Sequence, residues 1–580
     1  MLVLASCATR PVAPPPPTAV GTPPRPSAEP QPDSPSTPAA APGTRELVAE
    51  LVQAEREPDP TRRWHETRRL LAAMRALADP RGADALAGYV ANARGFPGEP
   101  ERVHRRTLAA FALAELGDLR ALDALGARLE LDPLEVYREE DPNHAELRRS
   151  DQERIIAARL IADLATLHPT EHERVRRATQ EPLRRWIAAA PAPHANGLRA
   201  LARMQIQEDA LSKQLRDWAD PAGALPKPGA LPPFEEKWVI AQSALRYTGA
   251  LRDAKSWAIL EKQLARKPKA FDASMDSLIS GGAAMLGMTV RALAAGAASG
   301  FAEWGDARAT PLLLKHIDDD RQNEESRLQA CHALGRVLDT KGEKEIVARL
   351  GKWKAAKDAA TQFRLGCVLH ALRVHPTAAA TPLLLELAAG SDASLVGNAA
   401  RTLGYAELGA DTERMLIARL SDARARHAAA VALLLGGSAG GAERALNATP
   451  ESEVEGLREA YARGLDASVL DGSRLGTLLR WVRNARALAT REPGRFATQQ
   501  LAKQLGELEY DTGPGSLTRV VLRRRLLELA RAGTPDERAG AVDTLELLGE
   551  RGVLLALAEG SDTLGERAAR AAAALRPPQP

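Results

Sequence analysis

The segment His168–His172, with the sequence HPTEH, brings together three side chains that could bind and use a zinc ion. Two histidines four positions apart lie on the same face of a helix, one turn from each other. Imidazole nitrogens are common zinc ligands, and a nearby glutamate can activate a zinc-bound water for hydrolysis. His168, Glu171 and His172 are therefore the candidate metal-binding residues of this chain.

The same segment also has the features of a turn between two helices. Pro169 fits only the first turn of a helix, which places His168 at or before the helix start, and Glu171 or Glu173 would complement the helix N-terminus. The motif resembles the H-x-x-E-H of inverzincin metallopeptidases, but the chain shows neither the acidic ligands nor the strands of that family. We adopt the turn and expect no metal, cofactor or small-molecule substrate.

Two further histidines and two cysteines lie in a pair of similar helical stretches, RLQACHALGR and FRLGCVLHALR. His332 and His370 could approach each other, but a single histidine in a helix is more often structural than a ligand; His316 and His375 lie nearby in the sequence. Cys331 and Cys367 are either buried small apolar side chains or a disulfide formed in an oxidising compartment. A bond would require their Cα atoms to lie within about 7 Å.

The remaining sequence lacks the common catalytic and nucleotide-binding patterns. It has no G-x-S-x-G, no P-loop, no G-x-G-x-x-G after a strand and no C-x-x-C. Its 78 basic and 75 acidic residues are spread along the chain, with no long block of one sign. Nucleic-acid binding needs a basic stripe, so we predict a protein that binds neither nucleic acid nor a small substrate.

Internal repeats indicate the architecture of the 580-residue chain. ATPLLL occurs at 309–314 and again at 380–385, and IVARL at 346–350 is matched by LIARL at 416–420. Both offsets are about 70 residues and the two pairs interleave, which gives a unit of about 35 residues. Alanine and leucine carry the apolar content while aromatic residues are only 4%, a composition that favours helices.

Each unit is predicted to contain two helices. The first carries a stripe of small residues and ends in glycine, which suits a left-handed helix stop. A turn with Asp and Arg follows, as in LGDLRAL and WGDARAT, and then a leucine-rich helix with Pro311 or Pro382 in its first turn. One hairpin cannot bury its own apolar face, so neighbouring hairpins must stack. The sequence therefore predicts an all-α solenoid.

This pattern resembles HEAT repeats, in particular the short bacterial variety named after phycobilisome lyases. The resemblance covers most of the chain from about residue 44. It implies a superhelix whose concave face binds a protein or a peptide. We divide the chain into an N-terminal array (44–219), a proline-rich loop (220–233), a C-terminal array (234–575) and a tail (576–580).

Tryptophans are the large side chains that could anchor a partner on such an array. The candidates are Trp64, Trp186, Trp238, Trp304 and Trp481. Tryptophan buries a large area at low entropic cost, so it is common at binding hot spots. The alternative is that each tryptophan fills a gap between helices.

The first residues of the chain have the features of an envelope address. LASC (Leu4–Cys7) resembles the bacterial lipobox, in which the cysteine is acylated. Residues 1–7 would be a shortened signal-like segment, and the proline-rich residues 8–43 an extended tether. With Ala8 after the cysteine, the resemblance implies an outer-membrane lipoprotein facing the periplasm. Residues 278–302, rich in glycine and alanine, are predicted to pack inside the array rather than span a membrane.

Together these features predict a non-catalytic scaffold or adaptor of the bacterial cell envelope. Cys7 would hold it at a membrane, and a protein or peptide would dock along the helices. The first alternative is a soluble cytoplasmic repeat protein with a disordered N-terminus. The second is a zinc hydrolase at His168, Glu171 and His172.

Overall fold

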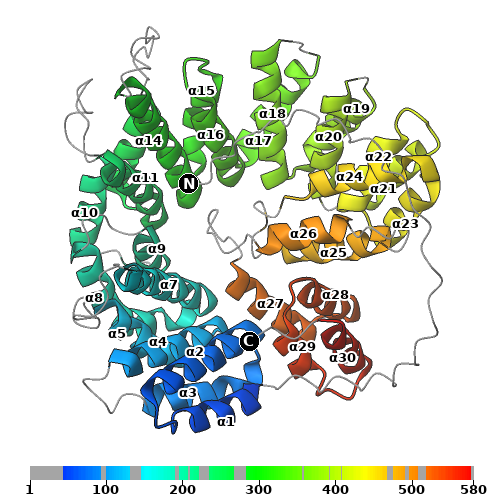
Figure 1. The fold of residues 1–580 in the computed structure, drawn as a ribbon. Coiled ribbons are helices and arrows are strands. Elements are labelled where there is room, and N and C mark those ends of the chain that lie inside the picture. The colour runs from blue at the N-terminus through cyan, green and yellow to red at the C-terminus, as the bar shows by residue number, and fades with distance from the viewer. Residues whose placement is uncertain are drawn as a thin grey trace, which may run out of the picture. The chain divides into compact units, whose positions relative to one another are not determined.

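In the computed structural model, α-helices and short 3₁₀ helices make up most of the described part of the unit formed by residues 42–580 (Figure 1). The structure describes residues 44–92, 100–130, 145–189, 195–204, 206, 209–220, 234–266, 282–355, 358–390, 392–406, 408–466, 470, 474–489, 496–506 and 518–575. No strand occurs within these ranges, so the predicted all-α class is confirmed. The segments 1–7 and 8–43, the loop 221–233 and the tail 576–580 lie outside the described residues.

The first part of the chain contains short and medium helices. They are α1 (Thr44–Ala54), α2 (Pro60–Leu77), η1 (Pro80–Gly82), α3 (Ala83–Asn92), α4 (Pro100–Glu115), η3 (Leu119–Ala121), α5 (Leu122–Glu130), α7 (Ala145–Leu167), η4 (Pro169–Glu171), α8 (His172–Ala189), α9 (Ala195–Arg203), α10 (Asp209–Ala219), α11 (Phe234–Leu251), η5 (Ala254–Ser256), α12 (Trp257–Leu264) and α14 (Gly282–Trp304).

The second part continues in the same manner. It contains η6 (Ala307–Ala309), α15 (Thr310–Asp318), α16 (Glu324–Val337), α17 (Thr340–Trp353), α18 (Ala359–Val374), η7 (Ala378–Ala380), α19 (Thr381–Ala388), α20 (Ala393–Tyr405), α21 (Ala410–Arg419), α22 (Arg426–Gly436), α23 (Ala439–Ala448), η8 (Glu451–Glu453), α24 (Val454–Gly464), α25 (Leu475–Ala489), α26 (Phe496–Gly506), α27 (Arg519–Ala532), α28 (Pro535–Leu547), α29 (Arg551–Leu557) and α30 (Thr563–Ala574).

The helices stack in sequence order, as a solenoid requires. One row runs through α2, α4, α7, α9, α11, α14, α16, α18, α20 and α22, each packed on the next. The helices α3, α5, α8, α10, α12, α15, α17, α19 and α21 each pack on the first-row helix that follows. The row continues from α9 to α11 across the proline-rich loop. The predicted array of stacked hairpins is confirmed.

The repeat period seen in the sequence is the period of the hairpins. The first-row helices α16, α18 and α20 begin at Glu324, Ala359 and Ala393. The two ATPLLL segments form α15 and α19, with Pro311 and Pro382 in the first turn, and the two related ARL segments lie in α17 and α21. All four repeated segments therefore belong to second-row helices.

The predicted Asp and Arg turns form short 3₁₀ helices. Before α5, Asp118 accepts a hydrogen bond of 2.9 Å from the backbone N–H of Arg120, whose guanidinium pairs with the same carboxylate. Before α15, Asp306 and Arg308 repeat the arrangement, with a backbone bond of 2.8 Å. The aspartate therefore caps the 3₁₀ helix that joins the two helices of the hairpin.

The glycines at the ends of the first helices have two different roles. Gly117 and Gly305 have φ of +78° and +68°, as a left-handed helix stop requires. The predicted glycine stop is wrong for Gly335, which lies inside α16, and Gly404 lies inside α20 in the same way. A Cβ on Gly335 would lie 2.5 Å from the Cβ of Val374, so this glycine lets α16 approach α18.

The segment rich in glycine and alanine packs inside the array, as predicted. It forms most of α14, which contacts α11 and α16. A Cβ on Gly249 of α11 would lie 1.9 Å from the carbonyl oxygen of Gly300 of α14, so only glycine permits this contact. Among the described residues, none of the helices has the length and apolar character needed to cross a membrane.

The last helices of this unit pack against its first helices, which the sequence did not predict. Arg523 of α27 pairs with Glu550 at 2.6 Å and donates a hydrogen bond of 2.9 Å to the carbonyl oxygen of Glu115 at the end of α4. Gly552 of α29 lies directly against the carbonyl of Leu77 in α2. We call the packing of α27 and α29 on α2, η1, α4 and α7 the closing contact.

Candidate functional site

The candidate zinc residues lie in a turn between α7 and α8. His168 precedes η4, and its Nε2 lies 2.7 Å from the carbonyl oxygen of Gly117. The Nε2 of His172 lies 2.9 Å from a different carbonyl, that of Ala165, and Glu171 is exposed. The two histidines therefore hold the turn rather than a common ligand. Within the described part of the chain, no group of three His, Cys, Asp or Glu side chains is placed to hold a metal ion.

Three of the five candidate tryptophan anchors belong to the core. Trp481 is fully buried, and its Nε1 donates a hydrogen bond of 3.1 Å to the carbonyl oxygen of Leu435. Trp186 and Trp304 are buried as well, and Trp304 meets the ring of Trp257 edge-on at 5.1 Å. As a correction to the predicted anchors, these three side chains fill gaps between helices and do not face a partner.

The other two tryptophans have different surroundings. Trp64 in α2 is half-buried and packs on the ring of His104 in α4, with centroids 4.9 Å apart. Trp238 belongs to α11, but its side chain is outside the described part of the structure, as is Cys7. Trp64 therefore remains a candidate for a surface anchor.

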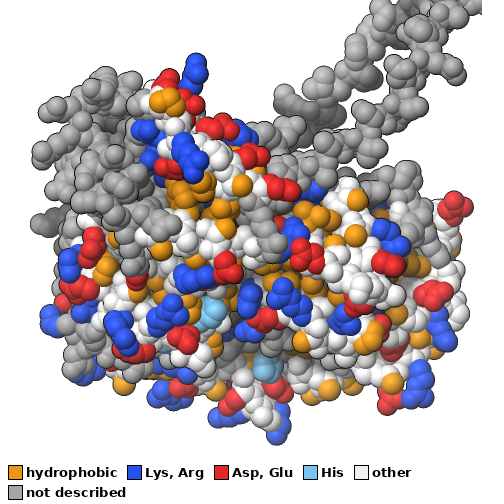
Figure 2. Space-filling view, turned by 90° about the horizontal axis from the view of Figure 1, so that it is seen from below, with side chains coloured by type: hydrophobic (Ala, Val, Ile, Leu, Met, Phe, Trp, Pro, Cys, Tyr) orange, Lys and Arg blue, Asp and Glu red, His pale blue; other side chains and the backbone are white. Residues whose placement is uncertain are grey.

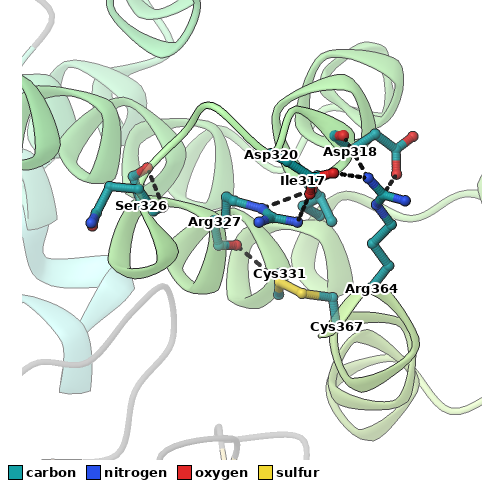
Figure 3. Close-up of a disulfide and its surroundings, with 9 residues drawn as sticks. Ile317, Asp318, Asp320, Ser326, Arg327, Cys331, Arg364 and Cys367 are labelled. Atoms are coloured by element: carbon teal, nitrogen blue, oxygen red, sulfur yellow. Dashed lines mark hydrogen bonds and ion pairs between the residues drawn. A yellow bond between two sulfur atoms is a disulfide. The ribbon is translucent and has the colours of Figure 1, made fainter. Parts of the chain in front are cut away.

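Cys331 and Cys367 form a disulfide between the first-row helices α16 and α18 (Figure 3). Their Cα atoms are 5.0 Å apart and both residues are buried. Nearby, Arg364 of α18 pairs at 2.6 Å with Asp320, which precedes α16. The sequence left open whether these cysteines are bonded, and the structure joins two successive repeats covalently.

His332 and His370 approach each other, as the sequence suggested. Their rings stack with centroids 4.0 Å apart and an angle of 21° between the planes. Burial, then the positive charges of His332 and Arg373, lower the pKa of His370 to about 2. His370 is therefore neutral at neutral pH, and its buried Nε2 has no hydrogen-bond partner among the described residues.

Two arginines, one on α18 and one on α20, follow the histidine stack along these helices. Their hydrogen bonds go to neutral acceptors. Arg373 donates to the Oδ1 of Asn398 at 3.0 Å and to the Oγ1 of Thr402 at 3.4 Å. Arg401 donates to the carbonyl oxygens of Gly397 and Arg463 at 3.2 Å and 3.5 Å. Burial lowers the pKa of both guanidinium groups, because it disfavours their charged form.

Two fully buried arginines elsewhere in the array pair with carboxylates instead. Arg199 of α9 lies 2.7 Å from Asp163 of α7, and Arg128 of α5 lies 2.8 Å from Glu153 of α7. Around Arg373, the carboxylate that favours its charged form is Asp466, just after α24. The surface over α18 and α20 thus differs in its electrostatics from these two contacts of α7 with α5 and α9.

An open row of residues lies one helical turn before the histidines and Arg401. It consists of Leu328, Gly366 and Gly397, each four positions before His332, His370 or Arg401. Leu328 is 44% exposed, one of the few large apolar side chains that are, and no atom lies within 4 Å of a Cβ built on Gly366. We call the partly exposed surface formed by Leu328, His332, Gly366, His370, Arg373, Gly397 and Arg401 the α16–α20 face; Leu328, His332 and Gly366 are exposed and the other four residues are half-buried.

The histidines of the α16–α20 face can be recognised in the sequence, but its arginines and glycines were not predicted. The available signal was the spacing of four residues between Gly366 and His370, and between Gly397 and Arg401, in consecutive repeats. The other two histidines have structural partners. His316 is buried between the carbonyl of Leu264 and the hydroxyl of Ser326, and His375 lies 2.8 Å from Glu343.

Comparison with known proteins adds little to this description. No family model matches the chain, and no curated protein is similar to it. Among solved structures, the chain is similar to the UNC-45 chaperone, described as binding and folding muscle myosin, with 12% identity and a TM-score of 0.19. The match covers 91% of this chain and 75% of that chain. With a TM-score this low, the fold rests on the helix contacts of this chain itself.

Proposed function

We propose that this protein is a non-catalytic scaffold that docks a protein partner along its stacked helices, held at a membrane of the bacterial envelope through Cys7. The observation that carries the docking role is the row of first helices packed in order over most of the chain. Stacked helical hairpins commonly present an extended surface for peptides and partner helices. On the face drawn in Figure 2, acidic and basic side chains are interspersed, which suits docking of a protein better than binding of nucleic acid.

The disulfide supports the envelope as the location. Cys331 and Cys367 are both buried and bonded. Disulfides persist in the periplasm and are rare in the cytosol, where thiols are kept reduced. The LASC segment before the proline-rich residues agrees with this location, since an acylated cysteine followed by an extended segment would hold the array away from the membrane.

Membrane fractionation with crosslinking tests the proposal. Wild type and Cys7→Ser would be expressed with their native upstream sequence, and partners crosslinked in membranes would be identified. We expect wild type in the membrane fraction with a defined partner, and Cys7→Ser in the soluble fraction. A Cys7→Ser protein that stays in the membrane fraction would refute the anchor. If wild type forms no specific crosslink to any protein, the docking role is refuted.

A further inference from the structure

We propose that the α16–α20 face binds an acidic segment of the partner protein, with the carboxylates of that segment at Arg373 and Arg401 and an apolar side chain on Leu328. This inference rests on the proposed docking function and specifies where and by what chemistry docking occurs. It draws on the charge of the face, on its open glycines and on the arrangement of both along three successive helices.

The charge of the face selects an anionic ligand. The charge of Arg401 disfavours the charged form of Arg373, that of Arg463 disfavours the charged form of Arg401, and the hydrogen bonds of Arg373 and Arg401 go to neutral acceptors. His370, one of the two stacked histidines, is neutral at neutral pH and adds no charge to the face. Asp466 supplies one negative charge, which leaves the face with positive charge in excess. A carboxylate would give these arginines the charge-assisted pairing that Arg128 and Arg199 have.

The open row leaves room for a peptide backbone to approach the arginines of the α16–α20 face. Gly366 is exposed, and a Cβ built on it would meet no atom within 4 Å. A Cβ on Gly397 would meet only the guanidinium of Arg401, at 3.8 Å. Neither glycine is required by contacts within the array, unlike Gly335 or Gly404. Close approach of another backbone is a common reason for glycine at such positions.

The order of side chains along the face favours a peptide segment as the ligand over a single small anion. The exposed Leu328 lies on α16, and the guanidinium groups lie on α18 and α20. First-row helices pack about 8 to 10 Å apart. An extended peptide that crosses the three helices could therefore place an apolar side chain on Leu328 and carboxylates at Arg373 and Arg401 at the same time. Free phosphate could bind only at the two arginines.

Fluorescence anisotropy with a labelled peptide of alternating Glu and Leu tests the proposal, and its Gln and Leu counterpart reports the part played by charge. Gly366→Leu fills the open row at a position where a Cβ meets no atom within 4 Å. Gly88→Leu in α3 is the matched control, since a Cβ there also meets nothing within 4 Å. Arg401→Gln removes one positive charge. Thermal unfolding verifies that each variant folds.

We expect wild type and Gly88→Leu to bind the Glu and Leu peptide equally. Gly366→Leu and Arg401→Gln should bind it at least about tenfold more weakly than wild type. The Gln and Leu peptide should also bind at least about tenfold more weakly. Equal binding to Gly366→Leu and Gly88→Leu, equal binding of both peptides, or no binding to wild type would each overturn the proposal. If Gly366→Leu keeps all membrane crosslinks, the docking function stands and this site is rejected.

Discussion

At the scale of single residues, Gly305 and Gly88 show how the backbone conformation of a glycine decides the effect of alanine on stability. Gly305 has φ of +68°, and its Cβ would meet only the guanidinium of Arg252, at an ordinary contact distance of 3.8 Å, so the cost of alanine there is that of the left-handed backbone. Gly88 lies inside α3 with nothing near its Cβ. We expect Gly305→Ala to lower the free energy of unfolding by about 1 kcal/mol and Gly88→Ala to raise it by about 0.5 to 1 kcal/mol. Urea unfolding of both variants measures the difference, and a shift of the same sign in both would contradict it.

The buried His316 makes stability depend on pH. Burial is the first cause that lowers its pKa to about 4, against an ordinary value of 6.5. Below pH 6.5 the unfolded chain therefore binds a proton that the folded chain does not, and stability falls as the pH drops toward 4. The loss from this residue is about 2 kcal/mol at pH 5. We expect His316→Gln to have a smaller difference in unfolding free energy between pH 7 and pH 5 than wild type. The exposed His65→Gln is the control, and an unchanged difference in His316→Gln would refute the assignment.

At the scale of elements, the disulfide is the strongest single constraint between two repeats. It closes a loop with a sequence separation of 36 residues, and chain entropy predicts a stabilisation of about 3 to 4 kcal/mol for a loop of this size. We expect the double variant Cys331→Ala, Cys367→Ala to unfold at a lower temperature than wild type and to be insensitive to dithiothreitol. Dithiothreitol should bring wild type close to the variant. If dithiothreitol leaves the wild-type transition unchanged, the bond is not present in the folded protein.

Elements were predicted well where the determining interactions lie within one hairpin. The prolines at the start of α15 and α19 and the aspartates that cap η3 and η6 act on residues two or three positions away, so their effect can be recognised in the sequence. The role of Gly335 or Trp481 depends on which atoms of another helix face it. Gly335 resembles a helix stop by sequence but meets Val374, and Trp481 resembles a surface anchor but meets Leu435.

The same limit applies to the α16–α20 face. The pair of histidines was predicted to approach because both lie in recognisable copies of the repeat. Arg373 and Arg401 look like ordinary helix-surface arginines, since the carboxylates that would neutralise such residues are contributed by other helices. Only the stacked structure distinguishes them from Arg199, which has Asp163 beside it.

At the scale of the whole unit, the closing contact makes the first and last hairpins depend on each other. Repeat arrays usually end in hairpins with a polar outer side, because each repeat contacts only its neighbours. Here the side chain of Arg523 bridges Glu550 and the end of α4, and Arg81 after α2 pairs with Glu559 after α29 at 2.9 Å. Local sequence patterns carry no information about contacts over such separations.

Gly552 offers a direct test of the closing contact. A Cβ there would lie 2.2 Å from the carbonyl oxygen of Leu77 and 2.8 Å from the Cα of Asp79, and neither backbone atom can move without displacing the end of α2. We expect Gly552→Val to separate α29 from α2 and to speed amide hydrogen exchange in α2, η1 and α27 to α29. Gly476→Val in α25 is the control, since its Cβ would meet nothing within 4 Å.

Exchange in the middle of the array distinguishes a local opening from general unfolding. Because stability in a stacked array is passed between neighbours, α16, α18 and α20 should keep wild-type protection in Gly552→Val. The radius of gyration from small-angle scattering should increase, since the two ends are no longer held together. Faster exchange throughout the chain would show instead that closure stabilises every repeat, and unchanged exchange at both ends would show that the first and last hairpins fold independently.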